Sequence, residues 1–308
     1  MAQPSSFTAA RKLFLATFVK HLFDNNEFVL ASRNWNKYAN TGSVEWTESG
    51  ARPKSRRNGE RGAATPKQDI KRSYSIDEFK TDPTILTWVE ELVVSYAKRE
   101  NILEEHIEQI REDIVMHILY KWVKGSKDVV IETTGDTKKG VDGTDAHAVT
   151  PDDFFDSQTE MDEQGVPDDG SRVAVVPASM MGDLRKYKDF HDRNKYPGMV
   201  LMNGAVGQIA GYNIFKRAKT LLFDVDGNPI ERKTEGSDQE YQAQAGDSRT
   251  ITLWHPKFVT RAISRKSKIS LIDGHDGVEV STTTIAGGDV YYSDGRGIIT
   301  IREKKKAS

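Results

Sequence analysis

The chain has 308 residues, of which 37% are apolar and 29% charged, and its formal net charge is −2. That length allows one large or two modest domains with a real hydrophobic core. The sequence contains no cysteine, which excludes disulfides, thiolate zinc sites and cysteine nucleophiles. The charge balance gives no overall basic footprint for nucleic acid, and no apolar run reaches the length of a membrane span.

The first predicted element is an amphipathic helix over residues 6–23, where Phe14, Phe18 and Leu22 recur at four-residue spacing. Its apolar run 13–19 follows two basic residues, as in a signal peptide. Two more polar residues interrupt the run and no small-residue cleavage site follows, so a helix is favoured.

The character of the chain changes between residues 33 and 80, where aliphatic residues are scarce and basic residues crowd together with glycine and proline. This stretch cannot form a core of its own. Two strand-like segments, Gly42–Trp46 and Asp69–Phe79, flank its centre and predict a long two-stranded arm with a mobile tip. An isolated hairpin is barely stable in water, so such an arm needs a surface to cover.

Residues 84–96 fit either a capped helix or a strand, which their β-rich composition slightly favours. The firmest element comes next. Asn101 with Glu104 resembles a capping box, and a continuous apolar face predicts a helix over about residues 98–124.

An acidic tract covers residues 132–170, and Thr150 is expected to cap a short helix from Pro151 to about Gln164. A run of carboxylates is usually a solvated face. It could also be a docking surface for the basic arm of a neighbouring copy.

From Ser171 onward the sequence predicts a compact α/β unit. It begins with a strand Val173–Val176, a helix Ala178–Asn194, and a glycine-rich turn and strand. A two-residue turn at Asp226-Gly227 within 223–230, a polar loop 231–248, a strand Arg249–Trp254 and a helix His255–Lys266 follow. The unit ends with strands Ile269–Asp273, Asp289–Ser293 and Gly297–Arg302, and an Asp-Gly turn joins the last two.

The segment NGAVGQIAGYNIF, residues 203–215, carries Gly204, Gly207 and Gly211. A dinucleotide site needs G-x-G-x-x-G between a strand and a helix. These glycines are spaced by three and then four, and strand-like residues follow them. The spacing therefore favours a turn in which glycine allows positive φ or close backbone approach.

Two further patterns contain residues that could ligate a metal. An EF-hand loop counted from Asp224 would need glycine at its sixth position, which is Pro229, so DVDGN is interpreted as a hairpin turn. His106 and His117 share one helix, but no third ligand stands at metal spacing. Core-edge or solvated histidines are the favoured interpretation.

Catalysis has one candidate, the DGHDG segment with Asp273, His275 and Asp276. It is flanked by glycines and predicted to be a loop tip. No nucleophile on a defined elbow accompanies it, so a hydrolase stays an alternative from a different functional class.

The order of parts, from N-terminal helix through basic arm, long helix and acidic segment to the α/β unit and final strands, resembles the tailed-phage major capsid protein of the Hong Kong 97 type. The resemblance includes coats of short-tailed and crAss-like phages. It is carried by YAKRENILEEHIEQIREDIVMHILYKW for the spine helix, by TPDDFFDSQTEMDEQGVPDDGSRVAVVP and SMMGDLRKYKDF for the passage between domains, and by NGAVGQIAGYNIF and WHPKFVTRA for the axial domain.

The resemblance implies an α+β capsid fold with an N-terminal arm (1–40), an extended loop or E-loop (41–81), a peripheral domain with the spine helix (82–170), an axial domain (171–288), and final strands with a basic tail (289–308). It implies a subunit that is not an enzyme and holds no cofactor or metal. Such a subunit assembles in the host cytoplasm, as hexamers and pentamers, into an icosahedral virion head around double-stranded DNA, without sequence specificity and without a membrane. Portal, scaffolding and head auxiliary proteins are the implied partners.

Under the same resemblance, the arm supplies the assembly interface and the three glycines shape a turn in the domain that meets its copies around a capsomer axis. The expected interface residues are Arg52, Lys54, Arg56, Arg57, Arg61 and Lys67. An encapsulin-type compartment shell is the nearest alternative, because it would share the fold and enclose protein cargo instead.

Overall fold

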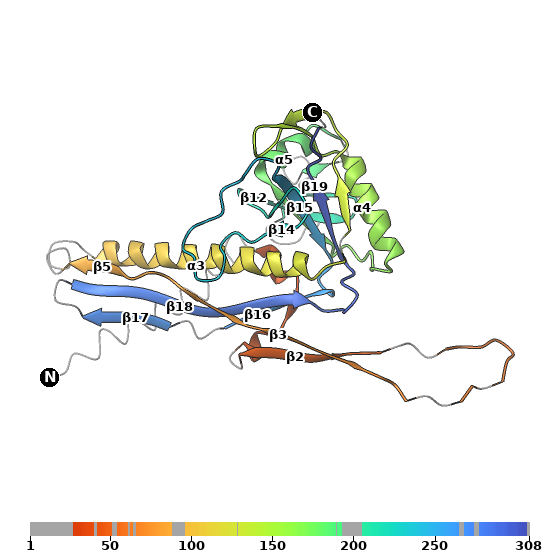
Figure 1. The fold of residues 1–308 in the computed structure, drawn as a ribbon, viewed down its shortest axis with the longest axis horizontal. Helices are drawn as coiled ribbons and strands as arrows, with labels where there is room; N and C mark the ends of the chain where they lie inside the picture. Colours follow the sequence, from red (N-terminus) through yellow and green to blue (C-terminus); the bar gives the residue numbers. More distant parts are fainter. Residues whose placement is uncertain are drawn as a thin grey trace.

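The computed structural model describes residues 27–39, 42–50, 54–60, 62–63, 66–87, 96–127, 129–188, 190–192, 205–264, 268–273 and 277–306. The helix predicted over residues 6–23 lies outside them. Figure 1 shows an elongated lower layer, in which a long helix lies along a sheet, a second sheet with helices above one end of it, and a thin hairpin arm that projects from the lower layer.

The lower sheet is organised around one long strand, β18. In the described residues its strands are β1 (Arg33–Asn34), β4 (Asp77–Lys80), β5 (Thr84–Thr87), β16 (Val259–Ile263), β17 (Lys268–Asp273) and β18 (Gly277–Val290). Along one edge of β18, β17 pairs with the first half and β16 with the second; β5 and β4 pair along the other edge. The strand β18 therefore joins the strands that follow the arm, β4 and β5, to β16 and β17 from the C-terminal third of the chain.

The long helix α3 (Tyr96–Lys124) covers one face of this sheet and confirms the helix predicted over 98–124. Its 29 residues span about 43 Å at 1.5 Å per residue. Its apolar stripe, which includes Ile110, Ile114, Ile118 and Trp122, is buried. The strand below alternates to match, with Val280, Thr282, Thr284 and Ala286 buried, because successive side chains of a strand point to opposite faces.

The second sheet lies above one end of α3. In the described residues it contains β6 (Val130–Glu132), β9 (Val173–Pro177), β10 (His191–Asp192), β11 (Gly207–Ile209), β12 (Tyr212–Arg217), β13 (Leu222–Phe223), β14 (Pro229–Ile230), β15 (Ser248–Trp254) and β19 (Ile298–Arg302). The strands predicted at 173–176 and 249–254 are thereby confirmed.

The two faces of the second sheet join two different cores. Val175, Phe215 and Trp254 belong to the apolar cluster shared with α3, whereas Val176 and Leu253 belong to a cluster with the short helices. Burial on both faces explains why these strands read as continuous apolar runs.

The two short helices are α4 (Pro151–Glu163) and α5 (Ala178–Leu184). In α4 the predicted cap is confirmed: Thr150 and Asp153 form a capping box, with proline in the first turn. The helix predicted over 178–194 is too long. It ends at Leu184, and bonds such as Tyr187 N–H to the Leu184 carbonyl continue the chain as turns.

The remaining short elements are the 3₁₀ turns η1 (Glu27–Leu30) and η2 (Asn36–Tyr38), the arm strands β2 (Ser43–Glu48) and β3 (Ile70–Ser75), and the hairpin β7 (Thr137–Lys139) with β8 (Asp145–His147). The strand β5 agrees with the favoured interpretation for the start of 84–96; residues 88–95 lie outside the described part.

The helix predicted over His255–Lys266 is wrong. A turn follows His255, and β16 pairs with β18 from Val259 to Ile263. All five residues of β16 are buried, so the two-residue alternation that would have identified a half-buried strand is missing.

Two further expectations about strands are corrected. The strand expected at 289–293 is the end of β18, and β19 belongs to the other sheet, so the turn between them joins two layers instead of closing a hairpin. The turn at Asp226-Gly227 is one residue longer than predicted, because Asp224 and Asn228 form the closing backbone bond at 3.0 Å.

The glycine-rich segment forms a hairpin between β11 and β12. Ile209 pairs with Tyr212, which leaves Ala210 (φ 45°) and Gly211 (φ 76°) as a two-residue turn. Positive φ at both positions is the geometry that matches the twist of a tight hairpin. Gly207 is a paired residue of β11, and Gly204 lies outside the described residues.

We expect Gly211→Ala to lower the free energy of unfolding by about 1–2 kcal/mol, because a side chain disfavours the left-handed region. Its Cβ would also approach Asp168 Oδ1 to 3.1 Å. Ala210→Asn is the matched control and should leave stability unchanged or raise it, since Asn tolerates this conformation. Urea unfolding measures both; equal losses would contradict the turn geometry.

Candidate assembly interfaces and polar networks

The arm leaves the body as a two-stranded ribbon and carries its tip away from both sheets (Figure 1). The pairing of β2 with β3 runs from Ser43 opposite Ser75 to Glu48 opposite Ile70. Of the expected interface residues, Lys54, Arg56, Arg57 and Lys67 are exposed on the tip, and Arg52 and Arg61 lie outside the described residues. Lys67 pairs with Asp69 at 3.7 Å, an exposed contact that contributes little.

The two sides of the arm stay in contact just beyond the last strand pair. Gly50 donates its N–H to Asp69 Oδ1 at 3.1 Å. A Cβ on Gly50 would lie 1.6 Å from the Gln68 carbonyl oxygen, so a side chain cannot be placed there without moving the backbone. Gly50 therefore marks where the ribbon ends and the tip begins.

An aromatic cluster fixes the root of the arm to the body. The Trp46 ring lies 5.1 Å from Trp35, 5.8 Å from Tyr74 and 6.3 Å from Tyr291. Its indole N–H donates to the Tyr291 carbonyl at 3.1 Å. The Arg33 guanidinium lies over the Tyr291 ring, 3.6 Å from the ring centroid. Aromatic pairs of this kind stabilise beyond their buried area. This anchor was not predicted; the two tryptophans in an otherwise polar tract, Trp35 and Trp46, are the sequence signal that could have indicated it.

Polar contacts reinforce the same root. The Ser293 N–H donates to Glu48 Oε2 at 2.8 Å, and Arg72 lies 3.6 Å from Asp289. Burial raises the pKa of Asp289, despite the Val290 N–H and the Arg72 charge that favour its ionised form. The direction in which the arm leaves the body is therefore set by contacts to the end of β18 and to the segment that follows it.

The polar segment 231–247 is held against α3 by ion pairs. Arg232 lies 2.7 Å from Glu112 on the helix and 2.9 Å from Glu240 within the segment, and Lys233 lies 2.8 Å from Asp113. Burial alone would lower the pKa of Arg232, but its two carboxylate partners raise it overall. The segment predicted as a polar loop is therefore a strap that joins the second sheet to the long helix.

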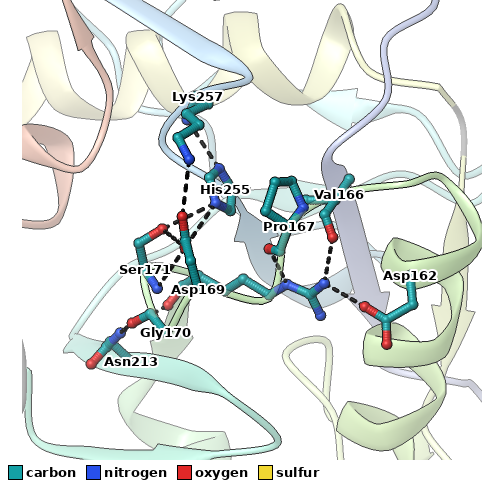
Figure 2. A network of polar contacts seen from close by, with 10 residues as sticks. Asp162, Val166, Pro167, Asp169, Gly170, Ser171, Asn213, His255 and Lys257 are labelled. Carbon is teal, nitrogen blue, oxygen red and sulfur yellow. Dashed lines mark hydrogen bonds and ion pairs between the residues drawn. The ribbon is translucent and has the colours of Figure 1, made fainter.

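A second polar network, drawn in Figure 2, joins the end of α4 to β9 and to the turn after β15. Arg172 is fully buried and donates to the carbonyls of Val166 (2.7 Å) and Pro167 (3.1 Å) and to Asp162. Nearby, Asn213 donates to the Gly170 carbonyl at 2.8 Å. The bonds of Arg172 pair a buried cation that would be strongly destabilising alone, although its Nη1 has no hydrogen-bond partner among the described residues.

The same network places Ser171, His255 and Asp169 together (Figure 2), the residue types of a hydrolase triad. The hydrogen bonds do not fit that chemistry. His255 Nδ1 accepts the Lys257 N–H at 3.1 Å, so Nε2 carries the proton and donates toward Ser171 (3.0 Å) and Asp169 (3.1 Å). The serine hydroxyl donates to Asp169. A protonated Nε2 cannot accept a serine proton, which a general base must do.

We expect the Asp169 network to make stability sensitive to acid. The Ser171 hydroxyl, Lys257 and His255 hold the pKa of Asp169 well below its usual range. A lowered carboxyl pKa stabilises the fold above the unfolded-state value of about 4, and this contribution is lost as pH falls below it. Asp169→Asn should therefore flatten the acid limb of unfolding free energy against pH. Asp152→Asn, on the exposed face of α4, should keep the wild-type slope; identical slopes for both variants would refute the assignment.

The remaining candidate residues from the sequence are placed only in part. His275 and Asp276 lie outside the described residues, and Asp273 ends β17. Within the described part of the chain, no group of three or more histidine or acidic residues is arranged to hold a metal ion. Among the helices described there, none is long and apolar enough to cross a bilayer.

No family model and no curated protein matches the chain in sequence. Solved structures do match in fold. The capsid of Ralstonia phage GP4 aligns with a TM-score of 0.62 at 11% identity, over 90% of this chain and 88% of that chain. The capsid of cyanophage P-SCSP1u aligns with a TM-score of 0.60 at 14% identity, over 90% and 87% of the two chains.

This chain has the Hong Kong 97-type capsid fold. A virus-like particle from Pyrococcus furiosus shares the fold as well, with a TM-score of 0.56 at 7% identity over 95% of this chain and 99% of that one. In the terms of this α+β capsid fold, the arm is the E-loop and α3 is the spine helix. The arm, the helix and both sheets thus belong to one architecture that covers nearly the whole chain.

Proposed function

We propose that this chain is the major capsid protein of a tailed phage and assembles into the icosahedral shell of its head. The observation that carries the proposal is the alignment of phage capsid chains over about nine-tenths of this chain, together with an arm whose tip projects into solvent. The proposed parts are those expected from the sequence: N-terminal arm 1–40, E-loop 41–81, peripheral domain 82–170, axial domain 171–288 and final strands 289–308.

Hexamers and pentamers are the proposed building blocks. A ring of identical subunits uses heterologous contacts that close on themselves, and an arm that extends in one direction suits such contacts because each copy can cover the next. Permanent interfaces bury about 2,000 Å² or more. A ribbon anchored by the Trp46 cluster presents its surface to a neighbour without reorienting its root.

The proposed interface includes Arg52, Lys54, Arg56, Arg57, Arg61 and Lys67. A single exposed ion pair contributes only about 0–1 kcal/mol. These cations therefore act as a network repeated over many subunit contacts, with backbone pairing and apolar burial, at about 25 cal/mol per Å², supplying the rest.

The proposed partners are other copies of the chain, portal and scaffolding proteins, head auxiliary proteins, and double-stranded DNA packaged without sequence specificity. Assembly would take place in the host cytoplasm. A net charge of −2 suits a wall that encloses DNA without binding it tightly, since packaged DNA can keep its own counterions.

Electron microscopy of the purified protein tests the proposal, with closed icosahedral particles built from hexamers and pentamers as the expected result. A chain that stays monomeric at high concentration would refute it. The alternative is an encapsulin-type compartment shell. The observation in its favour is that a virus-like particle shares this fold. Particles isolated from the native source separate the two, because a phage head contains double-stranded DNA and a compartment contains protein cargo.

A further inference from the structure

The tip of the arm carries an Asn-Gly pair, Asn58-Gly59, at an exposed turn. Residues 54–60 are all exposed, and they lie beyond the last strand pair of the arm, Glu48 with Ile70. The backbone N–H of Gly59 is therefore outside the ladder of hydrogen bonds that joins β2 to β3. Asn58 has a φ of 53°, in the left-handed region that asparagine tolerates in turns.

An asparagine followed by glycine can react along its own backbone. The nitrogen of the following residue attacks the side-chain carbonyl carbon, Cγ, and closes a five-membered ring. A side chain on the following residue hinders this approach, whereas glycine has no Cβ and leaves the backbone free to rotate. The Arg56 guanidinium donates from Nη1 to the Glu60 carbonyl at 3.3 Å, so the pair lies in a turn that Arg56 and Glu60 close. The reactive pair is thus accessible to water and lies outside any strand.

Two other asparagines show what protects such a side chain. Asn213 is buried, and its amide donates to two backbone carbonyls. Asn228 precedes Pro229, which has no N–H that could react. The second Asn-Gly pair of the sequence, at 203–204, lies outside the described residues. Of the described asparagines, Asn58 is the one that combines exposure, a turn and a following glycine.

We propose that Asn58 is a site of spontaneous deamidation, which adds a negative charge to the cationic tip of the arm. The Gly59 nitrogen loses its proton to solvent base and bonds to Asn58 Cγ. The amide nitrogen takes up a proton and leaves as ammonia, which gives a succinimide. Water then opens the succinimide at either carbonyl and leaves aspartate or isoaspartate at position 58.

The modification acts on the charge of the tip. Between residues 50 and 68 the sequence contains the six cations of the proposed interface and one carboxylate, Glu60. Deamidation places a second carboxylate directly after Arg57, and isoaspartate also lengthens the backbone by one carbon atom. A new negative charge weakens an interface that uses cations. Deamidated subunits should therefore assemble more slowly, a consequence that rests on the proposed function.

Mass spectrometry of the unassembled chain, aged in mildly alkaline buffer, tests the modification. Cleavage after lysine releases residues 55–67, whose one asparagine is Asn58, and residues 220–233, whose one asparagine is Asn228. We expect peptide 55–67 to deamidate at least about tenfold faster than peptide 220–233, and about tenfold more slowly in Gly59→Ala, because a Cβ restricts the turn. Aspartate and isoaspartate products separate by chromatography.

Asn58→Gln is the matched control and should stay unmodified over the same time, because its side chain would have to close a larger ring. Equal rates for the two wild-type peptides, or an unchanged rate in Gly59→Ala, would overturn the proposal. Both substitutions lie on the exposed tip, outside the strands and the core, so the fold of the subunit should be retained.

Assembly rates test the consequence separately. At low salt, Asn58→Asp should assemble about two- to fivefold more slowly than Asn58→Gln, since an exposed charge pair contributes about 0–1 kcal/mol. High salt should remove this difference. Equal rates for the two variants at low salt would refute the effect on assembly. If even the wild type forms no particles, the proposed function fails, whereas the deamidation of Asn58 is decided by the single-chain measurement.

Discussion

Deleting residues 50–68 abolishes closed particles while the body of the subunit stays folded; this is the largest effect that we expect. The deletion joins Ser49 to Asp69 directly after the last strand pair, Glu48 with Ile70. The result is a two-residue hairpin loop, and Ser49→Asn with Asp69→Gly gives it the sequence that such loops favour. Electron microscopy should show no shells. Thermal unfolding should stay close to wild type, because the Trp46 cluster at the root is retained.

The control for this deletion keeps the tip and removes its charge. The six proposed interface cations are changed to glutamine: Arg52, Lys54, Arg56, Arg57, Arg61 and Lys67. This variant should still form shells, but more slowly and with little dependence on salt, since charges more than about 8–10 Å apart are screened in ordinary buffer. Normal shells from the deletion variant would end the proposal that the arm clamps a neighbour. If the assembly rate of the wild type did not depend on salt concentration, the proposed role of the six cations in assembly would be refuted.

Replacing Trp254 with alanine should lower the free energy of unfolding by about 3–5 kcal/mol, as for other large aromatic side chains in cores. Trp254 is fully buried, with ring centroids 5.4 Å from Trp122 on the spine helix and 6.0 Å from Phe28. Its indole N–H donates to the Ala31 carbonyl at 2.8 Å. The substitution removes contacts that join the second sheet to the spine helix, to η1 and to Ala31 just after η1. Since domains have about 5–15 kcal/mol of stability in total, this loss would remove about a fifth or more of it.

Two variants separate packing from hydrogen bonding in this effect. Trp254→Phe keeps an aromatic ring and loses the bond to Ala31, so a smaller loss of about 1–3 kcal/mol is expected. Phe155→Ala removes a side chain that is 44% exposed on α4 and should change stability little. Urea unfolding measures all three. A loss for Trp254→Ala no larger than that for Phe155→Ala would contradict the assignment of Trp254 as a core contact between the layers.

Local signals were sufficient where one element buries one clear face or ends at a strong cap. The spine helix carries an apolar stripe from Ile110 to Trp122, and α4 begins at a capping box; both were predictable from spacing and residue type. The same signals failed for β16, which is buried at all five positions and was predicted as helix. They also failed for most of β18, because its alternation involves threonines and alanine and does not contrast apolar with charged residues.

The candidate sites divide in the same way. The sequence indicated an arm that is basic, poor in aliphatic residues and flanked by strands. It did not indicate that Trp46 and Tyr291, 245 positions apart, would meet at its root, or that segment 231–247 would form ion pairs with the spine helix. His117 was interpreted as a core-edge or solvated histidine. Its two carboxylate partners come from β4 and from the strap, 40 and 114 residues away.

By itself, the sequence determined the parts that depend on neighbouring residues: a long amphipathic helix, a capped acidic helix, a glycine turn, and a basic stretch unable to form a core. Only the tertiary structure decided which strands share a sheet, which direction the arm takes, and which charges meet. The physical reason is the separation along the chain over which each kind of interaction acts. Helix periodicity and capping act over three or four residues, whereas strand pairing, aromatic contacts and ion pairs join residues whose separation along the chain leaves no local pattern.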